Sequence, residues 1–148
     1  MVVSCFNNLK SNAIRSVQTA YNNTAQAFTA DGGTVAILGT RICDTGCAID
    51  AGATGFEIRS DGVYRISYDV VFEATGAGTA EVQLFSGEAA LPCSYSMFVA
   101  AAGGIYPMHI ETTIPVRACY GVRPMISCRV SGAAGNVTHV CASAVRLV

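Results

Sequence analysis

Apolar and polar residues alternate along one stretch of the chain, residues 63–74. One set of positions carries Tyr64, Ile66, Tyr68, Val70 and Phe72. The other set carries Arg65, Ser67, Asp69 and Glu73, with Val71 as the apolar exception. A period of two is typical of a strand with one buried face, and Tyr, Ile, Val and Phe favour strands. Asp61-Gly62 supplies a tight turn before it, so we expect a strand at the centre of a β-sandwich.

The chain beyond residue 33 repeats this pattern in short segments separated by glycine-rich turns, and it has no helical pattern. The expected strands are residues 34–42, 56–58, 63–74, 80–86, 89–92, 93–101, 105–116, 124–130 and 137–147. Residues 43–55, with glycines at 46, 52 and 55, are expected to form a loop. Short strands at regular spacing predict an all-β sandwich or barrel of the jelly-roll kind.

The first 33 residues differ from the rest because they are rich in Asn and end in a break at Asp31-Gly32-Gly33. A near-helical spacing of apolar residues allows a short helix, and an extended arm is equally possible. The spacing is that of Leu9, Ala13, Val17 and Tyr21. We therefore divide the chain into an N-terminal arm, residues 1–33, and a jelly-roll domain, residues 34–148. The arm is either a poorly ordered polar terminus or a segment that becomes ordered on docking to a larger particle.

The composition favours a surface that is partly covered by other subunits. Of 148 residues, 51% are hydrophobic and 13% are charged, about half the charged share of a typical soluble domain. Ala and Gly account for some of this excess, but Val, Ile and Cys contribute as well. The length fits one domain.

Charge and hydropathy argue against nucleic-acid and membrane partners. Nine basic and ten acidic residues give a net charge of −1 without a basic stripe, so binding to phosphates or to an anionic bilayer is not expected. Residues 89–108 carry no charge and are long enough to cross a membrane. Pro92, Pro107 and Gly103-Gly104 favour two strands and a turn instead. No basic start with an apolar core marks a signal peptide.

Candidate chemistry is sparse. Cys43 and Cys47, two of seven cysteines, are four residues apart, and both free thiols and a local disulfide remain open. A metal site would need His109 and His139, a spacing that matches no zinc motif. Neither histidine has a nucleophile in a neighbouring turn, and no calcium-loop pattern occurs. We therefore expect no catalytic residue, no metal and no cofactor, and hence no enzyme.

Three segments together resemble the TNF-like jelly-roll superfamily. They are the strand GVYRIS at residues 62–67, the strand end and turn LFSGE at 84–88, and the aliphatic terminal strand at 142–148. The similarity covers residues 34–148. It is greatest to the bacterial and phage branch, such as the head domain of collagen-like spore-surface glycoproteins.

This resemblance implies a homotrimer in which one sheet of each subunit packs around a three-fold axis. The residues expected at the trimer interface or in the core are Tyr64, Tyr68, Phe72, Val71, Tyr106, Val145 and Leu147. The chain lacks a Gly-X-Y stalk, so we expect a stand-alone head.

The function expected from this resemblance is structural. It is a homotrimeric component of a virion surface, such as a phage capsid decoration or fibre protein, anchored on the capsid by its N-terminal arm. The alternatives are a trimeric adhesion module that binds a host receptor or glycan, and a protein of a bacterial cell or spore surface.

Overall fold

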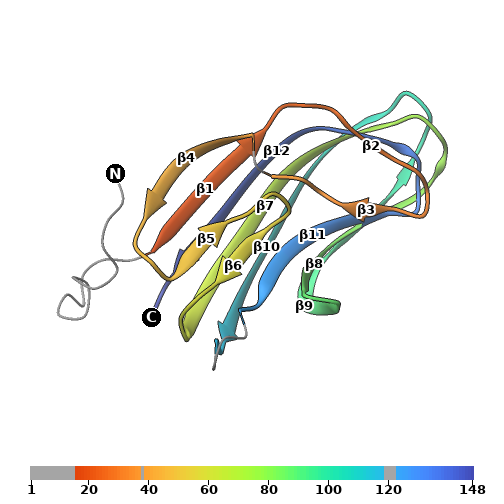
Figure 1. Cartoon of the computed structure of the whole chain (residues 1–148). Coiled ribbons are helices and arrows are strands. Elements are labelled where there is room, and N and C mark those ends of the chain that lie inside the picture. Colours follow the sequence, from red (N-terminus) through yellow and green to blue (C-terminus); the bar gives the residue numbers. More distant parts are fainter. Residues whose placement is uncertain (1–15, 38, 119–122) are drawn as a thin grey trace.

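The computed structural model describes residues 16–37, 39–118 and 123–148, and only the backbone of residues 41–43. In these ranges all regular structure is β-strand, and it forms two antiparallel sheets packed face to face (Figure 1). The all-β sandwich predicted from the sequence is therefore confirmed. The described ranges contain no helix that could cross a membrane.

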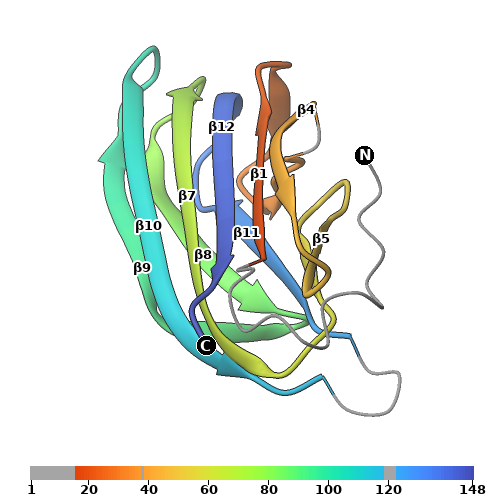
Figure 2. The ribbon, with the colours of Figure 1, turned by 90° about the vertical axis from the view of Figure 1, so that its left-hand side faces the viewer.

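One sheet, here called sheet A, has the strand order β10-β7-β12-β1-β4, with β2 also paired to β12. Its strands are β1 (Val17–Asn22), β2 (Gln26–Phe28), β4 (Thr40–Thr45), β7 (Gly62–Ala74), β10 (Ile105–Val116) and β12 (Gly135–Arg146). Figure 2 shows β10, β7, β12, β1 and β4 side by side in this order.

The second sheet, sheet B, has the order β5-β6-β11-β8-β9, with β3 also paired to β11. Its strands are β3 (Gly33–Thr34), β5 (Ile49–Ala51), β6 (Phe56–Ile58), β8 (Gly78–Ser86), β9 (Ala89–Ala100) and β11 (Met125–Ser131). The chain passes from sheet B to sheet A between β9 and β10, so these two strands form neighbouring edges of the sandwich.

The alternating stretch at residues 63–74 lies in β7, and its inward side chains lie in the core. They are at most 1% exposed: Tyr64, Ile66, Tyr68, Val70 and Phe72. Strand β7 has a neighbour on each side, β10 and β12, but the middle strand of sheet A is β12. The predicted central position is therefore corrected, because periodicity reports which faces of a strand are buried and not how many strands flank it.

Aromatic contacts join the two sheets across the core. The rings of Phe56 on β6 and Tyr68 on β7 meet edge to face, with centroids 6.1 Å apart. Phe72 meets Phe98 of β9 in the same way at 6.0 Å. Such pairs add about 0.5–1.5 kcal/mol each beyond the area they bury, so β7 is anchored to both β6 and β9 of sheet B.

The sandwich begins earlier in the chain than the predicted boundary at residue 34. Residues Val17–Asn22 form β1, which lies inside sheet A between β12 and β4. The helix that the spacing of Val17 and Tyr21 allows does not form, since their strand buries Gln18, Ala20 and Asn22 on one face. Leu9 and Ala13, the other two positions of that pattern, lie outside the described residues.

The single strand expected over residues 34–42 is replaced by a crossing between the sheets. The described part of this segment pairs in β3, leaves the sheet ladders and pairs again in β4. Between the two strands, Val35 and Ile37 are fully buried. The side chain of Gln26 holds the crossing by accepting from the Ala36 N–H and donating to its carbonyl oxygen, both at 2.7 Å. Residues 43–55, expected to form a loop, contain the end of β4 and the whole of β5.

Strand β9 is continuous where the sequence predicts two strands. Pro92 is tolerated because β9 is the edge strand of sheet B, where a missing N–H costs no ladder bond. The interruption appears instead as a register shift against β8 between Gln83 and Phe85 and as a left-handed backbone at Cys93, with φ of 60°.

Candidate subunit interface

The seven residues predicted at the interface or core occupy three environments. Tyr64, Tyr68 and Phe72 are fully buried inside the sandwich. Val71 and Val145 are half-buried on the outer face of sheet A, on β7 and β12, and Leu147 is half-buried just beyond β12.

Tyr106, the seventh, lies at the open edge of the sandwich, where its ring stacks on Phe98 at 4.5 Å. The structure therefore does not gather the seven side chains into one site. It brings forward two surfaces, the outer face of sheet A and the edge formed by β9 and β10.

On β12 and β1, the outer face of sheet A carries mostly small side chains without formal charge. Cross-strand pairing places Ser67, Ser143 and Thr19 in one row over β7, β12 and β1. The Thr19 and Ser143 hydroxyl oxygens lie 3.3 Å apart. On one side, Val145 stands between Val17 and Arg65. We call this part of the outer face of sheet A, over β12 and β1, the inner face, because it would turn inward in an assembly of subunits.

Charges on this face gather on the β7–β10 side. His109 Nδ1 lies 2.7 Å from Asp69 Oδ1, and its Nε2 lies 3.3 Å from Glu111 Oε2. Arg65 Nε lies 3.9 Å from the other Glu111 oxygen. Hydrogen bonds that Asp69 and, to a lesser extent, Glu111 accept from the His109 ring raise the pKa of His109. Exposed pairs of this kind contribute little to stability, but they would matter more if a neighbouring subunit covered them.

The edge formed by β9 and the start of β10 is apolar. Exposed side chains on or beside it are Met97 at 59%, Val99 at 79% and Ile105 at 65% exposure. Half-buried side chains of the same edge pack against the core: Leu91, Phe98, Tyr106, Met108 and Ile114. Edge strands with an apolar surface favour association. We call this surface the open edge.

The amino-acid sequence indicates the open edge only in part. Its signal is the uncharged run at residues 89–108, which predicts two strands and a turn. Met97 and Val99 are not singled out, because alternation alone does not tell an inward side chain from an outward one.

The cysteines fall into different states. Cys47 is disulfide-bonded, whereas Cys93, Cys128 and Cys141 are free thiols. The side chain of Cys43 lies outside the described residues, so its pairing with Cys47 stays a prediction. Among the described residues, no group of three or more His, Cys, Asp and Glu side chains could hold a metal ion.

By sequence, the chain matches no family model and no curated protein. Solved structures match by fold. Murine APRIL at pH 5.0 aligns with a TM-score of 0.65 and 12% identity over 90% of this chain and 99% of that one. PRD1 vertex protein P5 aligns with a TM-score of 0.66 and 10% identity over 93% of this chain and 100% of that one. The globular domain of zebrafish complement 1qA aligns with a TM-score of 0.61 and 12% identity over 90% of this chain and 98% of that one.

These similarities identify the fold as a TNF-like jelly roll, which confirms the fold class predicted from the sequence. The identities are low enough that the likeness concerns the fold alone. None of the sequence comparisons supports the bacterial and phage branch specifically.

Proposed function

We propose that this chain is a structural protein that assembles as a homotrimer on the surface of a particle, such as a phage capsid. The observation that carries the proposal is the presence of two unlike surfaces on one subunit. The inner face over β1 and β12 carries mostly small side chains without formal charge, and the open edge at β9 and the start of β10 is apolar.

Two unlike surfaces favour a ring. When one patch of a subunit meets a different patch of the next, the contact is heterologous, and it closes into a ring if the rotation per subunit permits. The open edge of one subunit would cover the inner face of the next, and the TNF-like resemblance supports three as the number of subunits. Burying both surfaces would also account for a chain with only 13% charged residues.

The particle role draws support from two sources. The fold is shared with a structure named PRD1 vertex protein P5, and the part of the N-terminal arm that precedes β1, residues 1–15, carries asparagines at 7, 8 and 12. In the proposal, this arm anchors the trimer on the particle, and no residue acts as a catalyst.

Light scattering coupled to gel filtration tests the assembly. The wild type should give three times the 15.3 kDa mass of one chain. Val99→Lys at the open edge and Ser143→Arg on the inner face should each dissociate it. Thr54→Lys is the matched control, since Thr54 is exposed between β5 and β6, away from both surfaces. A wild-type monomer at micromolar concentration would refute the proposal.

Mixing the two defective variants tests the heterologous geometry. Val99→Lys keeps an intact inner face, and Ser143→Arg keeps an intact open edge, so the mixture can form one good contact but cannot close. We expect a species of twice the monomer mass only in the mixture. If the mixture stays monomeric while the wild type is a trimer, the two surfaces do not meet each other.

Deleting residues 1–15 tests the arm. The truncated chain should keep the trimer mass and lose co-sedimentation with the particle. Dissociation of the truncated trimer would assign the arm to assembly rather than to anchoring.

A further inference from the structure

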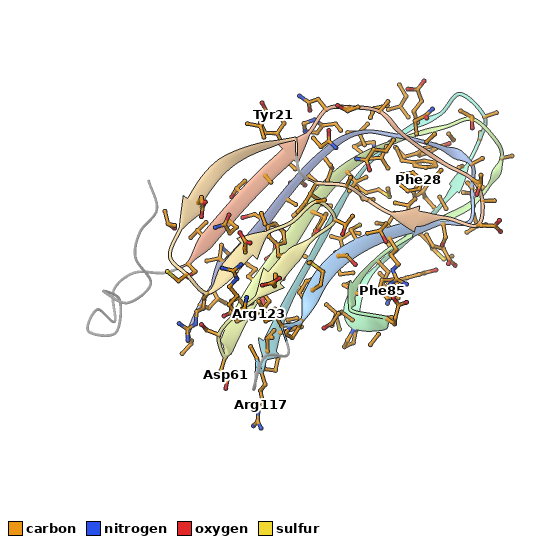
Figure 3. The ribbon with its side chains drawn as sticks, in the orientation of Figure 1. Tyr21, Phe28, Asp61, Phe85, Arg117 and Arg123 are labelled. Atoms are coloured by element: carbon orange, nitrogen blue, oxygen red, sulfur yellow. The ribbon has the colours of Figure 1, made fainter. Side chains whose placement is uncertain are left out.

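A pocket of about 250 Å³ opens on the outer face of sheet B, on the opposite side of the sandwich from the inner face. Cross-strand pairing explains its floor, because Tyr95 on β9, Gln83 on β8 and Arg129 on β11 stand in one row. Glu81 and Phe85 flank Gln83 along β8. The turn before β3 closes the far side with Asp31. Figure 3 labels Phe85 in this region of β8 and β9.

Hydrogen bonds hold the polar groups of the pocket in place. The Tyr95 hydroxyl donates to Glu81 Oε1 at 2.8 Å, and this acceptor raises the pKa of Tyr95, so the phenol stays a donor. The Gln83 amide nitrogen donates to the Leu91 carbonyl at 3.2 Å. One oxygen of Glu81 and the amide oxygen of Gln83 are left as acceptors for a bound molecule.

Arg129 is held on three sides. Its guanidinium carbon lies 4.3 Å from the centroid of the Phe85 ring. One Nη donates to the Gly87 carbonyl at 3.2 Å and lies 3.0 Å from a Glu88 carboxylate oxygen. Its Nε is buried and has no hydrogen-bond partner among the described residues. The arginine is therefore positioned and partly neutralised before any ligand binds.

The charges of the pocket select the class of ligand. Two carboxylates, Asp31 and Glu81, line it together with one guanidinium that already pairs with Glu88. Anions are repelled by this arrangement, and a cationic group would compete with the guanidinium of Arg129. A neutral molecule with several hydroxyl groups meets neither penalty. Each hydroxyl both donates and accepts, as the mixed acceptors and donors of the pocket require.

The geometry points to a binding site for one neutral sugar ring at the end of a glycan. Carboxylates and the Gln83 oxygen accept from ring hydroxyls, and the half-exposed Tyr95 ring offers a flat apolar face. The volume lies just below the roughly 300–1,000 Å³ of pockets for drug-sized ligands, which suits a single ring. The site itself does not depend on the proposed trimer, but three copies would gain avidity from it.

Titration of the full chain with free neutral monosaccharides tests the site. The probes are glucose, galactose, mannose and N-acetylglucosamine at millimolar concentrations, followed by backbone amide NMR. We expect one or more of them to shift the amide signals of Gln83, Tyr95 and Arg129. Glu81→Gln should weaken that binding about tenfold, because a hydrogen bond to a charged acceptor is lost. Tyr95→Ala should abolish it.

Glu57→Gln is the control, since it makes the same chemical change on β6 outside the pocket. Thermal melting establishes that each variant is folded, and Glu81→Gln keeps the test valid if Tyr95→Ala does not fold. The inference is overturned if no sugar shifts these signals, if sialic acid or a sulfated sugar binds instead, or if Glu81→Gln binds like the wild type.

A glycan array separates this site from the proposed assembly. The trimer should bind glycans that end in the sugar found by titration. The Val99→Lys monomer should lose array binding and keep the monosaccharide shifts. A wild-type monomer with normal shifts would refute the trimer and leave the sugar site standing.

Discussion

Two tyrosines on β7 place the same hydroxyl group in different surroundings. Tyr64 and Tyr68 are both fully buried. The Tyr64 hydroxyl donates to the Ser60 carbonyl at 2.6 Å. Among the described residues, the Tyr68 hydroxyl has no hydrogen-bond partner. We therefore expect Tyr64→Phe to destabilise the fold and Tyr68→Phe to stabilise it.

The expected size follows from the hydrogen bond, because both substitutions remove the same atom and leave the ring in place. Loss of the Tyr64 bond should cost about 1 kcal/mol. Burying an unpaired hydroxyl costs about 1–3 kcal/mol, and Tyr68→Phe should recover it. For a chain of this length, each kcal/mol moves Tm by about 2–4 °C, so the two variants should melt on opposite sides of the wild type.

Urea denaturation followed by circular dichroism measures the difference. All three proteins must be compared at one concentration, because dissociation of an oligomer makes apparent stability depend on concentration. Equal denaturant slopes would show that stability changed and not the compactness of the unfolded state. If Tyr68→Phe were less stable than the wild type with an unchanged slope, its hydroxyl would have a partner and the reasoning would be refuted.

Three further predictions concern single groups. Asp69 and Glu111 raise the pKa of His109 above 6.5. The attraction between these carboxylates and the protonated imidazole is therefore complete below pH 6.5 and is lost as the pH rises through the raised pKa of the folded protein. NMR titration should show the raised pKa and its fall in Asp69→Asn. Cys93 should react with a thiol reagent in the native protein, whereas Cys128, fully buried with its pKa raised to about 12, should react only on unfolding; equal rates would contradict this. Gly132→Ala should destabilise by more than about 1–2 kcal/mol in urea denaturation, since φ is 91° and the new Cβ would lie 1.9 Å from a β8 carbonyl oxygen.

The sequence predicts the strands that alternate over a long span and misses those whose role depends on the other sheet. Strands β7 and β10 follow the period of two along their length, and both lie close to the expected bounds. Val35 and Ile37 look like part of a strand because they are apolar, yet they are buried at a crossing between sheets. Apolar residues alone do not distinguish a strand from a crossing between the sheets, since both fill the core with the same residue types.

The candidate surfaces are predictable in chemistry and not in position. The low charge content indicates buried surface, and the uncharged run at 89–108 contains most of the open edge. Which of its side chains face outward depends on the register of β9 against β8, and a bulge sets this register. The pocket is harder still to predict from the sequence, because Asp31, Gln83 and Arg129 are far apart along the chain and meet only through strand pairing.

The two outer faces of the sandwich differ in what it costs to bury them against another subunit. The inner face of sheet A is small and uncharged over β1 and β12, and burying it costs no desolvated charge. The outer face of sheet B carries Asp31, Glu81 and Arg129 around a pocket, and burying these groups would require new partners for each of them. A subunit contact should therefore form between the outer face of sheet A and the open edge, and leave the pocket on sheet B in water. A trimer that buried this pocket, revealed by loss of the monosaccharide shifts on assembly, would contradict both the assembly geometry and the sugar site.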